Sequence, residues 1–125
     1  MVSDWRLSIS EYKEHVLTDR REFARLFRTG IRKSTRNVQL IFVPGKPEEL
    51  RFAVCVSVRF GNSVKRNRLK RIFRAALMPY LLRIQKGWVI AVLPTGKTEG
   101  LTSTIVAEQL EDLLRSRGML GGAHG

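Results

Sequence analysis

The stretch GNSVKRNRLKRIFRAALMPYLL, residues 61–82, decides the fold prediction. Upstream of it apolar residues alternate with a period of two, and after Gly61 and Asn62 the period becomes 3.6, which predicts a helix to about Leu82. One apolar stripe of this helix contains Leu69, Ile72, Phe73, Ala76, Leu77 and Tyr80. Pro79 lies inside the pattern and should kink or end the helix near its last turn, because proline lacks a backbone N–H.

A second face of this helix is cationic. At about 100° per residue, Arg66, Asn67, Lys70, Arg71 and Arg74 occupy a sector of roughly 140° beside the apolar stripe. Solvated helix faces usually include acids that form i,i+4 pairs, and this face has none. Guanidinium groups and asparagine amides in this arrangement favour nucleic-acid phosphates as the ligand. A solvated helix or a basic localisation signal is the alternative.

Charged residues are also unevenly distributed along the whole chain. Its 125 residues include 23 Lys or Arg and 11 Asp or Glu, a formal net charge of +12. No acidic residue occurs from Leu50 to Thr98. Because this segment cannot neutralise its own cations, either solvent or a polyanion must face them.

Composition predicts one globular domain over residues 1–125, with flexible ends at 1–15 and 118–125, since 43% of the residues are hydrophobic. The N-terminal stretch lacks the apolar segment of a secretory signal, and no apolar run approaches the roughly 20 residues that span a bilayer. The single cysteine, Cys55, lies in the apolar segment FAVCVSV, which predicts a buried thiol. We therefore expect a cytoplasmic protein that does not associate with membranes.

The remaining elements follow from local patterns. Asp19, with Glu22 three residues later, predicts a helix that ends at Gly30 and has Phe23, Leu26 and Phe27 on one face. RNVQLIFV, residues 36–43, predicts a strand, and PGKPEE a turn. RFAVCVSV, residues 51–58, is interpreted as its hairpin partner.

In this second strand, alternation separates a bulky core face from a small polar face. The core face contains Phe52, Val54, Val56 and Val58, and the polar face contains Arg51, Ala53, Cys55, Ser57 and Arg59. WVIAVL, residues 88–93, predicts a third strand, and a final amphipathic helix contains Ile105, Leu110, Leu113 and Leu114. This order predicts an α/β sandwich with a small mixed sheet, because the third strand follows a helical crossover.

The segment GNSVKRNRLKR, from Gly61 to Arg71, is similar to the pattern G-N-A-V-x-R-N-R-x-K-R of the protein component of bacterial ribonuclease P. EFARLFRTG and WVIAVLP also resemble that family's first helix and last strand, so the resemblance spans roughly Leu17 to Leu114. It implies a two-layer α/β (α+β) sandwich of order α-β-β-α-β-α with a left-handed β-α-β crossover, against the general right-handed preference.

The resemblance also implies a function. The family's protein is the non-catalytic subunit of a ribonucleoprotein endoribonuclease, whose RNA subunit removes the 5′ leader of precursor tRNA. The implied partners are this catalytic RNA and precursor tRNA, with no protein partner required, and the implied cofactor is Mg²⁺ bound mainly by the RNA. No catalytic or metal-binding residue is expected in the protein.

Two groups of site residues follow from the resemblance, position by position. The RNA subunit would be bound by Asn62, Lys65, Arg66, Asn67, Arg68, Lys70, Arg71 and Arg74. The single-stranded leader would lie in a cleft between the first helix and the sheet, formed by Phe23, Phe27, Ala53, Cys55, Ser57 and Arg59. Aromatic rings suit that task because unpaired bases stack on them. For the two phenylalanines, ordinary helix-to-sheet packing is the alternative.

Several positions depart from the family pattern. Val58 and Arg59 replace two lysines, and Ile41 replaces an aromatic residue that here appears one position later as Phe42. A shift of one residue in a strand places Phe42 on the other face. Further departures are Phe60, Ser63 and Ala75. We expect these changes to alter affinity for RNA.

Other chemistry has weaker support. LPTGKT, residues 93–98, ends like a P-loop, but Ala91 occupies the position of the required first glycine. The acid-free block offers no carboxylates for a protein-borne nuclease, and His15 and His124 lie at opposite ends of the chain. A ribosomal or general structural RNA-binding protein without an enzymatic role remains the competing hypothesis. A helix-turn-helix DNA-binding protein is less favoured, because a strand precedes the basic helix.

Overall fold

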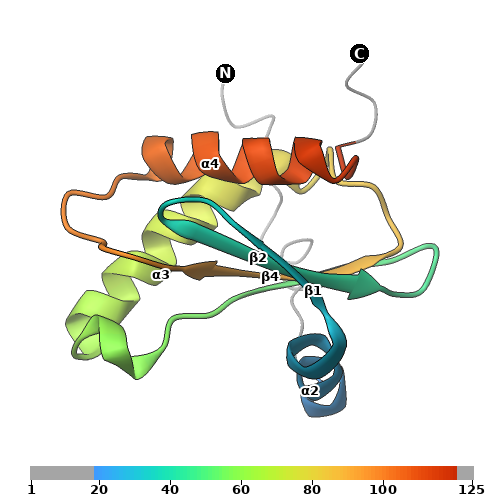
Figure 1. Cartoon of the computed structure of the whole chain (residues 1–125), viewed down its shortest axis with the longest axis horizontal. Helices are drawn as coiled ribbons and strands as arrows, with labels where there is room; N and C mark the ends of the chain where they lie inside the picture. The colour runs from blue at the N-terminus through green and yellow to red at the C-terminus, as the bar shows by residue number, and fades with distance from the viewer. Residues whose placement is uncertain (1–18, 121–125) are drawn as a thin grey trace.

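A four-stranded mixed sheet lies at the centre of the protein, with helices on both faces (Figure 1). The computed structural model describes residues 19–120. The strands are β1 (Ile31–Ser34), β2 (Val38–Pro44), β3 (Leu50–Val54) and β4 (Trp88–Pro94). Their order in the sheet is β1-β2-β4-β3, and β4 is antiparallel to β2 and parallel to β3. The last strand in the sequence is therefore an inner strand of the sheet.

The predicted hairpin of the second strand with the first is wrong. β2 and β3 do not pair, because β4 lies between them and forms a ladder with each. Alternation identifies a strand and its two faces but carries no information on its neighbour. Val89, Ile90, Ala91 and Val92 are all buried, as expected of an inner strand covered on both faces. The parallel β3–β4 pair is joined through a helical crossover, as predicted. The left-handed sense of this crossover stays a prediction.

Two helices cover one face of the sheet and a third lies against the other (Figure 1). α3 (Ser63–Leu77) and α4 (Ser103–Ser116) pack on the first face, and with the sheet they form the predicted two-layer sandwich. α2 (Arg20–Thr29) contacts β2 and β4 on the opposite face. As predicted, α3 ends near Pro79, where the chain continues as the 3₁₀ turn η3 (Met78–Tyr80).

Each face of the sheet has its own apolar cluster. The larger cluster, under α3 and α4, includes Leu69, Phe73, Ala76, Leu77 and Tyr80, which confirms the predicted stripe, and Ile72 packs against it half-buried. The smaller cluster, under α2, contains Leu26, Ile41, Val43, Ala53, Val89 and Ala91. Ile41 and Phe42 therefore face opposite sides of the sheet, as their adjacent positions predicted.

Three local features of residues 31–106 differ from what the sequence predicted. β1 was not predicted, because all its residues are exposed and only its pairing with β2 defines it. Val58 is 77% exposed instead of buried, since the chain leaves the sheet at Val54 and forms a 3₁₀ turn, η2 (Val58–Phe60). In α4 the inward position belongs to Val106, which is fully buried, whereas Ile105 is 39% exposed.

Residues 118–120, which the sequence predicted to be part of a flexible end, lie against the rest of the fold. Met119 is fully buried in the larger cluster, and Leu120 forms a β-bridge with Ile84. The backbone N–H of Gln85 also donates to the Met119 carbonyl at 2.8 Å. The expectations for residues 1–15 and 121–125 lie outside the described residues.

A hydrogen bond from Tyr80 joins the end of α3 to α4. Its hydroxyl donates to Oε1 of Glu111 at 2.7 Å, and Arg115 donates to the other oxygen of the same carboxylate. Burial, and then the bond to Glu111, raise the pKa of Tyr80 to about 12. The hydrogen bonds from Tyr80 and Arg115 lower the pKa of Glu111. The ionised carboxylate is therefore the form that the fold favours.

Tyr80→Phe should lower the free energy of unfolding at pH 7 by about 1 kcal/mol, the typical contribution of one such bond. A carboxylate with a depressed pKa contributes stability above its unfolded value and loses it as pH falls through the folded value. The difference between wild type and Tyr80→Phe should therefore shrink below pH 4.5, the ordinary value for Glu111. Urea titrations at pH 7 and below pH 4.5 measure this difference in the free energy of unfolding. Arg115→Ala is the control, because it keeps the hydrogen bond from Tyr80 to Glu111. Equal stabilities at pH 7 would contradict the prediction.

Candidate nucleic-acid interface

The cationic sector of α3 has no acidic partner within residues 19–120. The ion pairs in this part of the chain are Glu49 with Arg51 and Glu111 with Arg115, and neither involves α3. Asn67, Arg71 and Arg74 are exposed, and Arg66 and Lys70 are half-buried. The first turn of α3 also contains no acid. The helix therefore presents uncompensated positive charge, as the sequence predicted.

The predicted RNA-binding residues of α3 divide into two groups. A surface cavity of about 470 Å³ is lined by Asn67, Lys70, Arg71 and Arg74 together with the exposed Val64. Lys65 and Arg68 instead line a second cavity, of about 500 Å³, on another side of the helix. Helical geometry explains this division, since spacings of three and four residues place Lys65 and Arg68 on one face of the helix and the residues of the first cavity on another.

The loop before α3 is fixed to the helix by specific contacts. Asn62 is the N-cap, and its Oδ1 accepts from the backbone N–H of Lys65 at 3.0 Å. Nε of Arg66 donates to the carbonyl of Gly61 at 3.1 Å. Gly61 has φ +119°, a backbone conformation that residues other than glycine rarely adopt. Asn62 and Arg66, which the resemblance predicted to bind the RNA subunit, therefore also hold this loop in place.

Phe23 and Phe27 lie side by side on α2. Their ring centroids are 6.3 Å apart and the ring planes differ by 10°. Both rings pack against the smaller apolar cluster and remain half-buried, so each has a packed side and an accessible side. The guanidinium of Arg32, on β1, lies 5.9 Å from the Phe27 ring centroid and donates to the Phe27 carbonyl at 2.7 Å. A cation thus accompanies the aromatic pair.

Ala53 and Cys55 lie on the same face of the sheet as these rings. Ala53 is buried in the smaller cluster, and Cys55 packs against it half-buried. Burial raises the pKa of the Cys55 thiol, and the ammonium group of Lys70 acts in the opposite direction. The positive charge of Lys70, on α3, therefore partly opposes the effect of burial on this thiol.

The other two predicted cleft residues lie beyond the strand. Ser57 is exposed and precedes the 3₁₀ turn. The Arg59 guanidinium lies 4.6 Å from the Phe60 ring centroid, and Arg59 lines the same cavity as Lys65 and Arg68. The structure therefore groups Arg59 with α3, because the chain turns away from the sheet after Val54. Phe23, Phe27, Ala53 and Cys55 remain together in or against the smaller cluster, and we call this group, where the sequence predicted a leader-binding cleft, the aromatic cleft.

Sequence reasoning missed Arg32, Arg36, Asn37 and Gln109. The first three lie in the short basic segment IRKSTRN, residues 31–37, which was a usable signal. Gln109 carried no signal, because its contacts are with residues more than 70 positions away.

The described residues show neither a cluster of metal ligands nor a membrane-spanning helix. Within residues 19–120, no three His, Cys, Asp or Glu side chains are grouped as metal ligands would be. His15 and His124 lie outside this range. No described helix has the length and apolar character needed to cross a bilayer.

Comparisons with known proteins agree with these observations. A family model described as Ribonuclease P matches residues 12–117. The ribonuclease P protein component of Shouchella clausii is 29% identical over 114 residues, which cover 90% of this chain and 93% of the relative. The corresponding protein of Synechococcus elongatus is 33% identical over 115 residues, covering 86% and 93%.

The solved ribonuclease P protein from Thermotoga maritima has the same fold. Its TM-score against this chain is 0.71 at 29% sequence identity, over 80% of this chain and 94% of that protein. The matched family region includes every helix and strand from α2 to α4.

Proposed function

Since this chain belongs to the ribonuclease P protein family, we infer that its cationic helix and its aromatic cleft contact two different RNAs. As a member of this family, the chain is the protein subunit of a ribonucleoprotein endoribonuclease that processes the 5′ end of tRNA. Its partner is the ribonuclease P RNA, which carries the catalysis.

α3 binds the RNA subunit in this proposal. The observation that carries it is the row of α3 cations without an acidic partner among the described residues. Exposed arginines on a rigid helix can neutralise backbone phosphates, and such contacts position an RNA without reading its sequence. Asn62, Lys65, Arg66, Asn67, Arg68, Lys70, Arg71 and Arg74 are the residues we assign to this contact.

The aromatic cleft binds the single-stranded 5′ leader of precursor tRNA. Phe23 and Phe27 each keep an accessible side on which an unpaired base can stack. Arg32 supplies positive charge beside the Phe27 ring. The stacked pair favours this function over that of a general structural RNA-binding protein, for which charge alone would suffice.

Magnesium and cellular location complete the proposal. The described side chains offer no cluster of oxygen ligands for Mg²⁺, so we assign the ion to the RNA subunit. This chain would help by lowering phosphate repulsion between RNAs, and so reduce the Mg²⁺ concentration that the reaction requires. A cytoplasmic location is part of the same proposal.

Reconstitution tests this function. Purified protein added to a bacterial ribonuclease P RNA should increase cleavage of precursor tRNA at low Mg²⁺, where the RNA alone is slow. Cleavage products on a denaturing gel measure the rate, and protein without RNA is the control. The absence of any enhancement, or cleavage by the protein alone, would contradict the proposal.

A further inference from the structure

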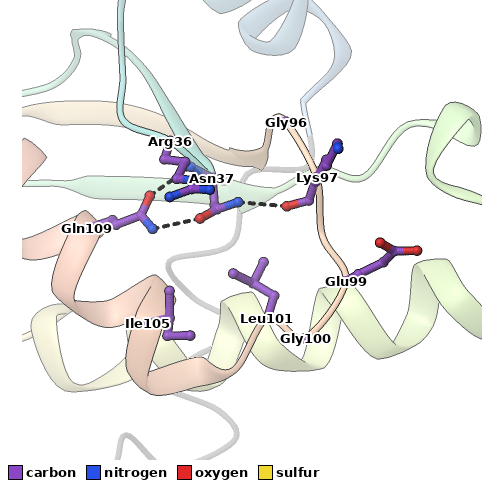
Figure 2. Close-up of a pocket in the computed structure, with 9 residues that line it drawn as sticks. All are labelled: Arg36, Asn37, Gly96, Lys97, Glu99, Gly100, Leu101, Ile105 and Gln109. Atoms are coloured by element: carbon purple, nitrogen blue, oxygen red, sulfur yellow. Dashed lines mark hydrogen bonds between the residues drawn. The ribbon is translucent and has the colours of Figure 1, made fainter.

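The loop between β4 and α4 separates two cavities at one end of the sheet. One cavity, of about 520 Å³, lies between this loop, the β1–β2 turn and the first turns of α4 (Figure 2). The other is the cavity of about 500 Å³ beside Lys65 and Arg68 of α3. Gly96, Lys97 and Glu99 line both. The two cavities therefore adjoin along this loop, and we call the combined surface the end groove.

Positive charge predominates along the end groove. Its cations come from three separate segments: Arg36 on the β1–β2 turn, Lys97 on the loop, and Arg59, Lys65 and Arg68 around the start of α3. Glu99 is its one acidic lining residue, and it forms no ion pair with a described cation. A surface of this composition attracts an extended polyanion.

A network of amide hydrogen bonds joins the two backbone segments that carry Arg36 and Lys97. Oε1 of Gln109 accepts from the Asn37 backbone N–H at 2.8 Å, and its Nε2 donates to Oδ1 of Asn37 at 2.9 Å (Figure 2). Nδ2 of Asn37 then donates to the Lys97 carbonyl at 2.7 Å. The turn that carries Arg36 is thus joined to the loop that carries Lys97.

Gly96 brings this loop and turn into close approach. It has φ +69°, and a Cβ at this position would lie 2.7 Å from the Arg36 carbonyl oxygen. Only glycine fits there without displacing backbone. Because loop and turn are already ordered, binding a ligand here loses little conformational entropy.

We propose that the end groove binds a backbone segment of the RNA subunit, as an extension of the α3 contact. This inference rests on the proposed function. Leu69 and Leu101 line the groove and belong to the apolar cluster under α3 and α4, whereas the aromatic cleft belongs to the cluster under α2. Groove and cleft are thus on opposite faces of the sheet. We therefore assign the groove to the RNA subunit and not to the leader.

The double variant Arg36→Ala/Lys97→Ala tests the inference. Its affinity for the RNA subunit alone should fall about 3- to 10-fold, and the salt slope should become shallower by about 1.5, as expected for two lost phosphate contacts. Filter binding across a salt series measures both quantities. Lys46→Ala/Lys86→Ala is the matched control, because it removes the same charge near the opposite end of the sheet, where Gly45 bonds to Gly87. Circular dichroism should show an unchanged fold in both.

A second variant tests the same surface in the opposite direction. Glu99→Gln removes the acidic lining residue and should tighten binding about 2- to 3-fold. Effects of the Arg36/Lys97 pair equal to those of the Lys46/Lys86 control would overturn the inference. A loss that appears only with precursor tRNA and depends on leader length would assign the groove to the leader and also overturn it.

Failure of this inference is distinguishable from failure of the proposed function. Wild type and Arg66→Ala are measured in parallel on the same RNA. If wild type binds and Arg66→Ala is weaker, while the Arg36/Lys97 variant matches wild type, the groove alone is wrong. If wild type neither binds the RNA subunit nor enhances cleavage, the function itself is wrong.

Discussion

Replacing Arg66, Lys70, Arg71 and Arg74 together with alanine is expected to weaken binding of the RNA subunit by about 100-fold or more at moderate salt. Each phosphate contact contributes about 0.7 to 0.9 to the salt slope, so the slope should become shallower by about 3. The buried stripe of α3 is untouched, because none of these side chains belongs to the core cluster. Equilibrium binding over a series of salt concentrations measures the affinity and the slope.

A charge-preserving variant is the matched control for this experiment. Arg66→Lys/Arg71→Lys/Arg74→Lys should keep the salt slope and recover only part of the affinity, because lysine lacks the planar fork that binds phosphate through two hydrogen bonds. Affinity within threefold of wild type for the alanine variant, with an unchanged slope, would show that the RNA subunit binds elsewhere.

Phe23→Ala/Phe27→Ala is expected to weaken binding of precursor tRNA to the assembled enzyme by about 10-fold or more, since stacking contributes about 1–3 kcal/mol per base. Binding of the RNA subunit, and binding of a tRNA without a leader, should remain unchanged. Titration of the reconstituted enzyme with substrates of different leader length measures this difference.

The leucine variant separates stacking from packing. Phe23→Leu/Phe27→Leu keeps apolar contact with the cluster that contains Leu26 and Ile41 but removes both rings. If the rings stack on the leader, the leucine variant should be nearly as defective as the alanine variant. Full recovery with leucine would mean that the rings act only in packing α2 against the sheet.

The sequence predicted the elements whose signals are local. α3 is the clearest case, since the Asn62 cap, the apolar stripe and the position of Pro79 all lie within one short segment. The start of α2 at Asp19 was equally clear, because Oδ1 of that residue accepts from a backbone N–H within the first turn. Capping and helical periodicity depend on near neighbours, which a sequence displays directly.

The pairing of strands could not be predicted in this way. β3 shows the same alternation whether its neighbour is β2 or β4, and only the parallel ladder with β4 settles the question. β1 has no buried side chain, so it carries no apolar pattern at all. In both cases the missing information lies in long-range hydrogen bonds.

The residues of the candidate site show the same difference between local and long-range information. The α3 cations and the Phe23–Phe27 pair follow from spacing on single helices. The placement of Arg59 depended on where the chain leaves the sheet, and the Asn37–Gln109 contact joins residues 72 positions apart. Residues that become neighbours only after folding remain invisible to a local pattern.

The inner position of β4 also sets an order on biosynthesis. A growing polypeptide completes α3, with all its arginines, before the ribosome reaches Trp88–Pro94, the strand that β2 and β3 both require as a neighbour. Until β4 has been made, β2 and β3 lack the strand that lies between them. The apolar stripe of α3 then has no complete sheet to pack against. Long-range pairing of this kind makes folding a late, cooperative event. Nascent chains shorter than about residue 94 should therefore lack the complete sheet against which the apolar stripe of α3 packs.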